Sequence, residues 1–536
     1  MEFEKSSIRS ARLGRWRAVP ILGKSNRGAA IIADLRARGS VIHRRPLRSV
    51  RRAARPVLAP ILVIAAMVMV SVPVAAQTYG WGGGGSGCVN SGCTTAFAVA
   101  LPVPAVLTPT STDATTDYYT LTERTANASI IPGKTTPVWT YNGVDNGNYL
   151  GPTIKATSGR QVKIHMVNNL TESTTLHLHG AHVASTSDGG PMDLVAPGGS
   201  RDYTYPNNQS ARTQWYHDHA MDNTATHVYK GMAGMYLISD PQEAALNLPS
   251  GPNDVPLVLQ DRQFNSDGTL AYSLDSSSIR GGFMGDTQLV NGAPQPYLKV
   301  GTRKMRFRVL NGSNARYYTL KLSNSQPIIQ IGNESGLRSA PLSLTSITLA
   351  PAERADIVID FSKLAVGTSV TLQNGSGYNN SADLMRFDVN TAVTDTSTVP
   401  ATLRPFTALN PADSTVNRTF TIAQNNGTWT FNNQVYGMTR IDADVKLGAT
   451  ETWTFDNRSG QDHPIHLHDI NFQVLSIGRG APPANANQWK ETVNVPAWSS
   501  ATILIKFVDF TGTYVFHCHI LEHEDKGLMG QFRVSS

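Results

Sequence analysis

The pattern of apolar and polar residues divides the chain into three unlike stretches. Basic residues dominate the first 56 positions, and the uncharged stretch 57–76 contains the apolar run Ile61–Val70. Residues 77–115 are rich in Gly, Pro and Thr. From about residue 116, short alternating stretches are separated by Gly, Asn, Asp and Pro, a pattern that predicts β-strands joined by turns. The sequence shows no long helical period there, so we expect an all-β fold.

The alternating region contains an internal repeat. In each copy a Gly and a short extended stretch lead to a second Gly, a strand and an Asn, at residues 151–168, 292–311 and 437–457. The copies start 141 and 145 residues apart, which is the length of a domain rather than of a solenoid unit. We therefore expect three β-sandwich domains in tandem, with linkers near 241–253 and 390–410. The predicted domains cover residues 116–245, 250–395 and 405–536.

Composition and charge exclude several classes of protein. Apolar residues make up 40% and charged residues 16% of the chain, which excludes a disordered chain or a coiled coil, and three cysteines exclude a disulfide scaffold. The net charge of +7 would favour nucleic acid as a partner. However, 15 of the 46 basic residues lie in residues 1–56, and residues 77–536 carry a net charge of −5. We therefore exclude nucleic acid.

The first 76 residues have the three parts of a secretory signal. Basic residues up to Arg55 precede the apolar run, and small residues end at Ala76. The apolar run is shorter than the roughly 20 residues that span a bilayer, which disfavours an uncleaved membrane anchor. The arginines at 51 and 52 leave a twin-arginine route open. We expect cleavage near Ala76, no stable membrane insertion, and a periplasmic or secreted protein that begins near Gln77.

Residues 77–115 are expected to form a flexible leader because of their Gly, Pro and Thr content. Cys88 and Cys93 lie in this leader, and a disulfide between them is compatible with an oxidising compartment. The sequence assigns these two cysteines no catalytic role.

Ten of the thirteen histidines after the signal fall into four clusters. Because residues i and i+2 of a strand point to the same face, each His-x-His motif directs two imidazoles to one point. Four such pairs supply eight imidazoles, too many for one ion and suited to a small metal cluster. The pairs are His177 with His179, His217 with His219, His466 with His468, and His517 with His519.

Cys518 lies between two of these histidines, so on a strand its sulfur points to the opposite face. There it can join His463 and His523, and one Cys with two His is the ligand set of a blue-copper site. The same peptide would then link a mononuclear copper to a metal cluster. A lone His-x-His is usually no metal site, and zinc needs only four ligands. Eleven ligand-type residues in four clusters disfavour both alternatives.

Together these motifs resemble the four copper signatures of three-domain multicopper oxidases, particularly bacterial spore-coat laccases and bilirubin oxidases. The resemblance runs from about residue 116 to 536. It implies cupredoxin-like domains with Greek-key topology and four copper ions: one type 1, one type 2 and a type 3 pair. The motifs are His-x-His-Gly at 177–180, Trp-Tyr-His-Asp-His at 215–219, His-Pro-x-His-x-His at 463–468 and His-Cys-His-x3-His at 517–523.

The resemblance also implies a role for each residue. Asp188 and Glu524 match acids that assist proton supply at the copper cluster, although the residues alone favour an Asp-Gly turn and a solvated surface charge. Among the remaining histidines, His165 is expected to be structural and His182 to lie near the cluster at most, while His227 has no assignment. The implied ligands are His463, Cys518 and His523 for type 1, His177 and His466 for type 2, and His179, His217, His219, His468, His517 and His519 for type 3.

One position departs from the related bacterial enzymes, which usually carry Met as the axial residue of type 1 copper. The axial position lies ten residues after the Cys and is Leu528 here. A non-coordinating Leu removes a thioether donor, so we expect a relatively high reduction potential. The competing hypothesis is a shift of one residue that places Met529 on the copper.

The implied reaction couples four one-electron oxidations at type 1 copper to reduction of O2 to two waters. O2 and a small aromatic or metal-ion reductant are the expected partners, and we expect a monomer. Phenols and aromatic amines are the default donors, while Mn²⁺ or bilirubin oxidation stays open. No Met-rich insert typical of cuprous oxidases is visible in the sequence. The alternative from another class is a periplasmic copper-sequestering protein, and the three repeats disfavour a two-domain nitrite reductase.

Overall fold

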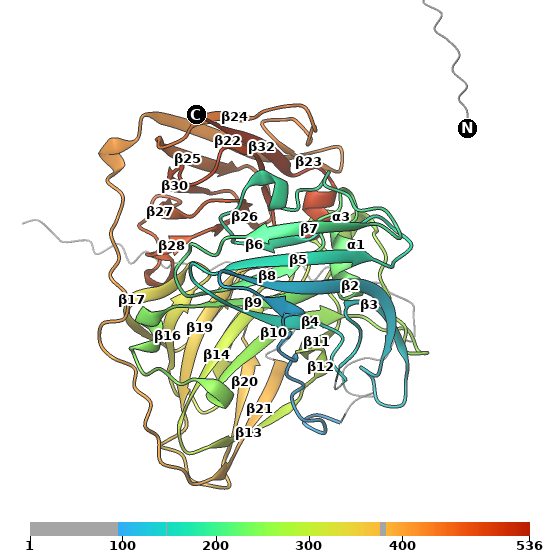
Figure 1. Ribbon diagram of the computed structural model, residues 1–536, viewed down its shortest axis with the longest axis vertical. Helices are drawn as coiled ribbons and strands as arrows, with labels where there is room; N and C mark the ends of the chain where they lie inside the picture. Colours follow the sequence, from blue (N-terminus) through green and yellow to red (C-terminus); the bar gives the residue numbers. More distant parts are fainter. Residues whose placement is uncertain (1–94, 146, 376–381) are drawn as a thin grey trace, which may run out of the picture. The chain divides into compact units, whose positions relative to one another are not determined.

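Six β-sheets, arranged as three pairs, make up the fold of the residues that the structure describes (Figure 1). The computed structural model describes residues 95–145, 147–375 and 382–536. Each pair of sheets uses one continuous stretch of sequence and encloses its own core of buried apolar side chains. The predicted all-β fold of three tandem cupredoxin-like sandwiches is confirmed. The expected export signal and both leader cysteines lie outside the described residues, and the domain boundaries stay a prediction.

The first pair of sheets lies between residues 111 and 239. One sheet has the strand order β1-β2-β5-β7 with β3 paired to β2, and the other has the order β4-β9-β8-β6. In β5 the buried Val162, Ile164 and Met166 alternate with more exposed residues, as a half-buried strand requires. The strands are β1 (Ser111–Thr112), β2 (Thr116–Ala128), β3 (Thr136–Tyr141), β4 (Gly151–Thr157), β5 (Gln161–Asn168), β6 (His177–His179), β7 (Ser200–Tyr205), β8 (Arg212–His217) and β9 (Ala233–Ser239).

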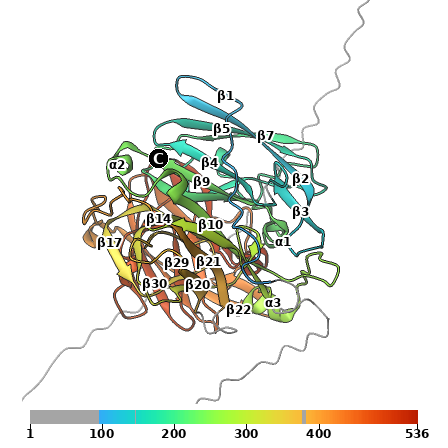
Figure 2. The ribbon, with the colours of Figure 1, turned by 90° about the horizontal axis from the view of Figure 1, so that it is seen from below.

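The second pair lies between residues 254 and 391 and is seen from below in Figure 2. Its sheets have the orders β12-β11-β10-β14-β19-β16-β17 and β13-β21-β20-β15-β18. The strands are β10 (Asp254–Arg262), β11 (Thr287–Val290), β12 (Ala293–Pro294), β13 (Tyr297–Gly301), β14 (Lys304–Asn311), β15 (Tyr318–Leu322), β16 (Ile328–Asn333), β17 (Gly336–Leu344), β18 (Ile347–Leu349), β19 (Arg354–Asp360), β20 (Ser369–Asn374) and β21 (Ala382–Thr391).

The third pair lies between residues 416 and 535. Its sheets have the orders β23-β22-β25-β30-β27-β28 and β24-β32-β31-β26-β29. The strands are β22 (Val416–Asn425), β23 (Thr428–Phe431), β24 (Ala443–Lys446), β25 (Thr450–Asn457), β26 (His463–Leu467), β27 (Phe472–Ile477), β28 (Trp489–Lys490), β29 (Thr492–Val495), β30 (Ser500–Lys506), β31 (Gly512–Cys518) and β32 (Met529–Ser535).

The internal repeat of the sequence corresponds to β5, β14 and β25. Each of these strands pairs in parallel with an earlier strand, namely β2, β10 or β22, and ends in a buried asparagine. The Nδ2 group of Asn168 donates to the carbonyl oxygens of Glu172 and Val195, which ties the following loop to the strand. Asn311 and Asn457 make the same kind of bonds in the other two sandwiches. The repeated Asn is therefore the closing residue of a recurrent turn.

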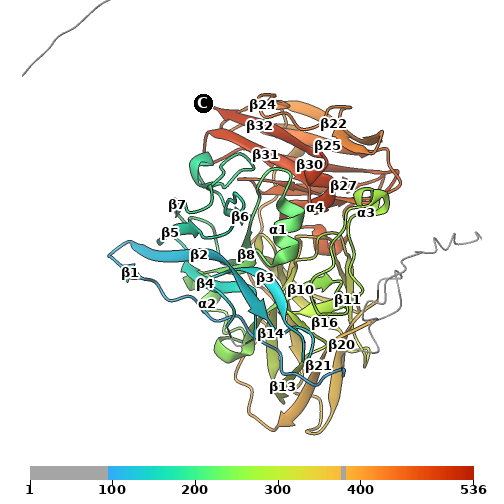
Figure 3. The ribbon, with the colours of Figure 1, turned by 90° about the vertical axis from the view of Figure 1, so that its right-hand side faces the viewer.

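Helices are short and lie in the connections between strands. They are α1 (Thr224–Lys230), α2 (Pro241–Ala244), α3 (Ser276–Gly281) and α4 (Leu521–Asp525), with single 3₁₀ turns at Ser185–Ser187, Gly251–Asn253, Pro411–Asp413 and Ala484–Ala486. Figure 3 shows α1 between β3 and α4, in agreement with the contacts of α1 with both elements. In the described part of the chain, no helix combines the length and apolar character that crossing a membrane requires.

Residues 95–115, which we expected to belong to a flexible leader, lie against the sandwiches. Leu101 is buried in the second core, and its N–H donates to the carbonyl oxygen of Tyr297. Further along, the N–H of Leu107 donates to the carbonyl oxygen of Thr153 in β4. The expectation fails for this part because its scattered apolar residues and backbone groups find partners on two different sheets.

A buried ion pair and one further hydrogen bond connect the three sandwiches. Arg354 of β19 and Glu491 form an ion pair with no exposed surface on either side chain. The Nε group of Arg354 donates at 3.0 Å to the carbonyl oxygen of Thr213 in β8. One guanidinium thus binds residues of the first and third sandwiches from a strand of the second. Removing it would leave the carboxylate of Glu491 buried and uncompensated.

We expect Arg354→Met to lower the free energy of unfolding by about 3–5 kcal/mol, because breaking a buried pair leaves a desolvated charge. Urea denaturation of the purified protein measures this. The matched control is Arg533→Met, since the pair of Arg533 with Asp444 is half exposed and solvent screens its attraction, so its loss should have little effect. Equal effects of the two substitutions would contradict the role assigned to Arg354.

Candidate metal centre

The strand β31 presents adjacent residues to two different groups of side chains. In register with β26, His517 lies opposite His466, and Cys518 lies opposite Ile465. Cys518 and Ile465 belong to the apolar core of the third sandwich, whereas the two histidines face the first sandwich, where other imidazoles gather. The alternation of side chains along one strand therefore separates two candidate metal sites.

The first site consists of His463, Cys518 and His523, all three fully buried. The Nδ1 atom of His463 lies 3.4 Å from the sulfur, and the Nδ1 atom of His523 lies 3.7 Å from it. The two Nδ1 atoms are 3.2 Å apart. These residues come from the start of β26, the end of β31 and α4, so the chain brings them together from three separate elements.

Hydrogen bonds determine which ring nitrogens face the centre of this site. The Nε2–H of His463 donates to the Ser459 hydroxyl at 2.9 Å, and the Nε2–H of His523 donates to the carbonyl oxygen of Arg280 at 2.9 Å. Both Nδ1 atoms then carry lone pairs, and two acceptors 3.2 Å apart repel each other unless a cation lies between them. This donor set fits a soft or borderline metal ion.

Burial sets the protonation of these groups in the metal-free chain. It lowers the pKa of His523 to about 3, and it raises the pKa of the Cys518 thiol well above its ordinary value. The imidazole is thus neutral, which is the form that binds metal. A bound metal ion itself enforces deprotonation of the thiol.

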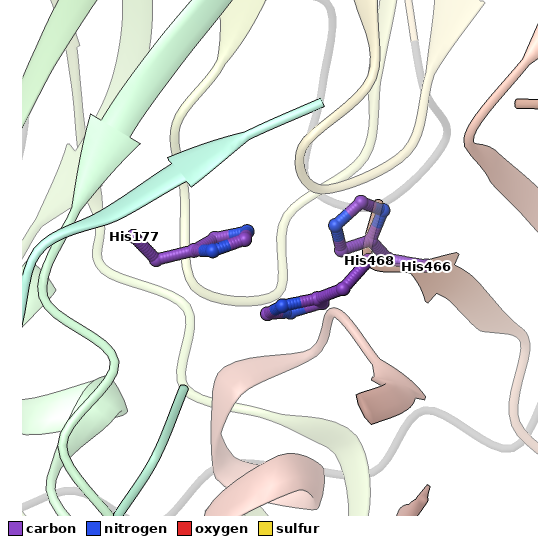
Figure 4. A group of neighbouring side chains, drawn as sticks. All are labelled: His177, His466 and His468. Carbon is purple, nitrogen blue, oxygen red and sulfur yellow. The ribbon is translucent and has the colours of Figure 1, made fainter. Parts of the chain in front are cut away.

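The second site gathers eight imidazoles between the first and third sandwiches. Figure 4 shows His177 on one side and His466 with His468 on the other, with their rings directed toward one another. Groups of three histidines have ring nitrogens that all lie within 4.8 Å of one another. These groups are His219 with His468 and His517, His177 with His466 and His468, and His177 with His179 and His217.

Two pairs of stacked imidazole rings connect the first and third sandwiches. His177 stacks on His468 with ring centroids 3.8 Å apart, and His179 stacks on His466 with centroids 3.7 Å apart. The first histidine of each motif therefore meets the second histidine of the other. This arrangement has the pattern of a local pseudo-twofold axis, and neither sandwich supplies the site alone.

Many ring nitrogens in the second site have no hydrogen-bond partner although they are fully buried. Nδ1 groups of His177, His217 and His466 donate to backbone carbonyls, which leaves each Nε2 as a lone pair directed into the site. The Nε2 atoms of His219 and His468 each lie 3.2 Å from that of His517. Buried acceptors without donors are costly, so this set fits several metal ions.

Two carboxylates bind the outer nitrogens of these imidazoles. An oxygen of Asp188 lies 2.8 Å from Nδ1 of His468, and oxygens of Glu524 lie 3.0 Å from Nδ1 of His517 and 3.3 Å from Nδ1 of His219. Both side chains are at least 95% buried. The alternative of a solvated surface charge at Glu524 is therefore wrong, and Asp188 does more than terminate a turn.

The environments of these two acids shift their pKa values in opposite directions. Burial raises the pKa of Asp188 well above its ordinary value. Burial also opposes ionisation of Glu524, but the imidazoles of His219 and His517 outweigh it and lower its pKa. Two buried acids with opposed shifts are typical of a site that handles protons.

Two further acids near the site carry no sequence signal of their own. Glu491 follows a lysine outside any histidine motif, yet its carboxylate lies 2.9 Å from Nε2 of His179. Asp218 is the middle residue of a His-x-His motif and is fully buried, and one of its oxygens accepts Nδ1–H of His227 at 2.9 Å. The spacing of histidines predicts ligands, whereas these carboxylates are recognisable only when the strands are placed.

The axial candidates lie on different faces. Leu528 is buried in the same apolar core as Cys518, and its carbonyl oxygen accepts the Cys518 N–H at 3.0 Å. Met529 lies opposite His517 in the register of β31 and β32, so its side chain shares the face of His517. The geometry therefore favours Leu528 as the neighbour of the sulfur.

Two histidines outside the motifs make their side-chain contacts away from the two sites. His165 pairs with Asp202 on the surface at 2.6 Å. His182 contacts Asp509 at 2.9 Å and Asn471 at 3.1 Å. By contrast, all eleven predicted ligands are buried. Ten of them belong to the groups described above, and the ring of His519 lies 4.9 Å from that of His179 between centroids.

Comparison with known proteins assigns the family. Residues 123–243 and 409–536 match multicopper oxidase domains. A laccase from Bacillus stratosphericus is 34% identical over 81% of this chain and 98% of its own length. A bilirubin oxidase from Albifimbria verrucaria is 34% identical over 82% of this chain and 81% of its own length. The crystal structure of a laccase from Pediococcus acidilactici has a TM-score of 0.76 and 33% identity, covering 82% of this chain and 94% of that one.

The chain therefore belongs to the multicopper oxidase family, as the sequence motifs predicted. This family consists of oxidoreductases that use copper and take O2 and a reducing substrate. The clusters of His and Cys described above are compatible with copper sites.

The pair of Asp218 with His227 makes a testable contribution to stability. Burial alone would lower the pKa of His227, but Asp218 and Glu172 outweigh it and raise the pKa above its ordinary 6.5. A raised pKa means that the charged pair stabilises the fold fully below about pH 6.5 and that this contribution is lost as pH rises through the folded-state pKa. We expect His227→Asn to cost about 1.5–3 kcal/mol near pH 6 and less near pH 9.

Chemical denaturation of the copper-free protein at several pH values measures this difference. The surface substitution His165→Asn serves as the control. A cost of His227→Asn that stays constant or grows with pH would show that the charge on His227 plays no part.

Proposed function

We propose that the protein is a laccase-type oxidase that couples one-electron oxidation of phenols or aromatic amines to the four-electron reduction of O2 to water. One observation carries the proposal: in the single peptide His517-Cys518-His519, the sulfur belongs to one candidate metal-binding group and the imidazoles lie among the histidines of the other. An electron accepted at the sulfur thus has a covalent path to the cluster. A protein that only stores copper has no need of such a link.

In this proposal the first site holds type 1 copper through His463, Cys518 and His523. Leu528 is the axial residue that the resemblance implies and has no donor atom, while Met529 faces the other side, so neither side chain would bind the copper. His177 and His466 hold type 2 copper. The type 3 pair is held by His179, His217, His219, His468, His517 and His519.

Bound copper would supply the one-electron oxidant at the first site and the O2-reducing centre at the second. The chain supplies protons and orientation. Asp188 and Glu524 hold ring nitrogens of His468, His517 and His219, and their opposed pKa shifts suit them to pass protons to the reducing centre. The backbone carbonyls that accept Nδ1–H groups keep the ligand rings in one tautomer.

The proposed location is the periplasm or the cell exterior, after cleavage near Ala76. It is supported by the basic, apolar and small-residue pattern of residues 1–76. Oxidation of Mn²⁺ or Cu⁺, or copper sequestration, remains the alternative activity.

Oxygen uptake by copper-loaded residues 77–536 with 2,6-dimethoxyphenol tests the proposed function. We expect sustained uptake without release of peroxide. Cys518→Ser keeps all eight cluster histidines and removes the sulfur, so it should abolish donor-driven uptake, whereas the surface variant His165→Asn should retain it. Fully copper-loaded wild-type protein that consumes no O2 would instead favour a metal-ion oxidase or a copper store.

The axial position can be tested by redox titration of the type 1 absorption. We expect Leu528→Met to lower the reduction potential by about 60 mV or more, a tenfold change in the equilibrium constant of a one-electron couple, because a thioether donor stabilises the oxidised ion. Met529→Leu is the matched control and should leave the potential unchanged. The reverse pattern would place Met529 on the copper.

A further inference from the structure

The type 1 candidate His523 is shielded from direct contact with a substrate. Its side chain has no exposed surface, and its Nε2–H is bound to the carbonyl oxygen of Arg280 in α3. Trp429 packs on the His523 ring at 4.4 Å between centroids and donates its indole N–H to the carbonyl oxygen of Ile279. An electron donor in solvent therefore needs a route past α3 and Trp429.

A cavity of 380 Å³ lies where β3, α1 and residues 269–272 meet. This volume is within the range of about 300–1,000 Å³ that is typical of small-molecule sites. Aromatic rings form much of its wall, and three threonines add hydroxyl groups. The lining residues include Trp139, Tyr229, Leu270 and Tyr272, with Thr125, Thr226, Thr269 and Lys230.

Tyr272 links this cavity to α4. Its ring packs against Tyr229 at 4.6 Å and against Phe283 at 4.9 Å. Its hydroxyl donates at 2.9 Å to a carboxylate oxygen of Glu522, which is fully buried. Glu522 immediately precedes His523 in the chain, so one hydrogen bond and one stretch of covalent structure connect the cavity wall to the type 1 candidate.

The Tyr272 hydroxyl is held in place by a well-packed neighbourhood. Its ring packs against the buried cluster of Ala225, Val228 and Leu521, which joins α1 to α4. The same Glu522 oxygen also accepts the side-chain N–H of Asn314 at 2.8 Å. Both partners of the bond are thus fixed, and electrons couple better through fixed hydrogen bonds and covalent bonds than across a gap.

We propose that this cavity binds phenolic carboxylates and that Tyr272 and Glu522 form the path by which their electrons reach the type 1 site. The inference rests on the proposed function and names the donor class. Each step removes one electron and the phenolic proton from the donor. The electron would pass to copper(II) at the first site, which His463, Cys518 and His523 would hold. The proton would go to solvent at the open side of the cavity, and the phenoxyl radical would leave.

The choice of a carboxylate follows from Lys230. Among the residues that line the cavity it is the one charged side chain, and its ammonium group lies 3.7 Å from the centroid of the Trp139 ring. Its partner Glu172 is 43% exposed and so competes only weakly for the ammonium. A donor with an aromatic ring and a carboxylate could use both features of the cavity. Its ring would pack against Trp139 or Tyr272, and its carboxylate would pair with the Lys230 ammonium.

Binding and electron transfer are tested separately. Calorimetric titration of the copper-loaded protein with cinnamate, which has no phenol to oxidise, measures binding alone. Lys230→Met should weaken cinnamate binding by about tenfold, because a charge-assisted bond is lost, and Tyr272→Phe should leave it unchanged. Under anaerobic stopped flow with saturating 4-hydroxycinnamate, Tyr272→Phe should slow bleaching of the type 1 absorption several-fold.

Matched controls exist elsewhere in the first sandwich. Lys163→Met removes another ammonium near an aromatic ring, and Tyr118→Phe removes another hydroxyl bonded to a carboxylate. Neither should change cinnamate affinity or the rate of bleaching. Cinnamate binding that Lys230→Met leaves intact would overturn the proposed site, and unslowed bleaching in Tyr272→Phe would overturn the proposed path. If cinnamate binds but no donor supports O2 uptake, the proposed function fails and not the site.

Discussion

Side chains along β31 point alternately to opposite faces of the sheet, and both candidate metal sites depend on this constraint. Because neighbouring residues of a strand face opposite sides, Cys518 enters the apolar core of the third sandwich while His517 faces away from it. His519 follows the strand directly, and its ring lies near that of His179. A shift of register by one residue would exchange the faces and destroy both groups at once. Pairing with β26 on one side and β32 on the other fixes that register.

Four of the eight histidines in the second site occupy equivalent positions of the internal repeat, in two of its three copies. Counting from the closing asparagine, positions 9 and 11 are His177 and His179 in the first copy and His466 and His468 in the third. In the second copy they are Leu320 and Leu322, both buried in its core. The close stacking of the first and third copies therefore uses equivalent positions, whereas the second sandwich keeps these positions for packing.

Much of this organisation was predictable from sequence, and the part that was not has a physical reason. Strand alternation, the internal repeat and the His-x-His spacing are local patterns that can be read from the sequence. They predict the fold and the division of the eleven ligand-type residues into two groups. The burial of Glu524 and the contact of Glu491 with His179 depend on how separate sandwiches pack, which no local pattern encodes. The same holds for residues 95–115, whose partners lie on distant strands.

Among the residues that the structure describes, the second sandwich contributes none of the eleven candidate ligands, but several of its groups bind residues of the two sites. From it come the guanidinium of Arg354, which balances Glu491, and the carbonyl oxygen of Arg280, which binds His523. It also supplies Tyr272, whose hydroxyl reaches the residue before His523. The sequence of the second-sandwich loops near His523 can therefore change without replacing any of the candidate ligands. Differences in donor between otherwise similar oxidases are therefore expected to arise in these segments rather than in the strands that hold the histidines.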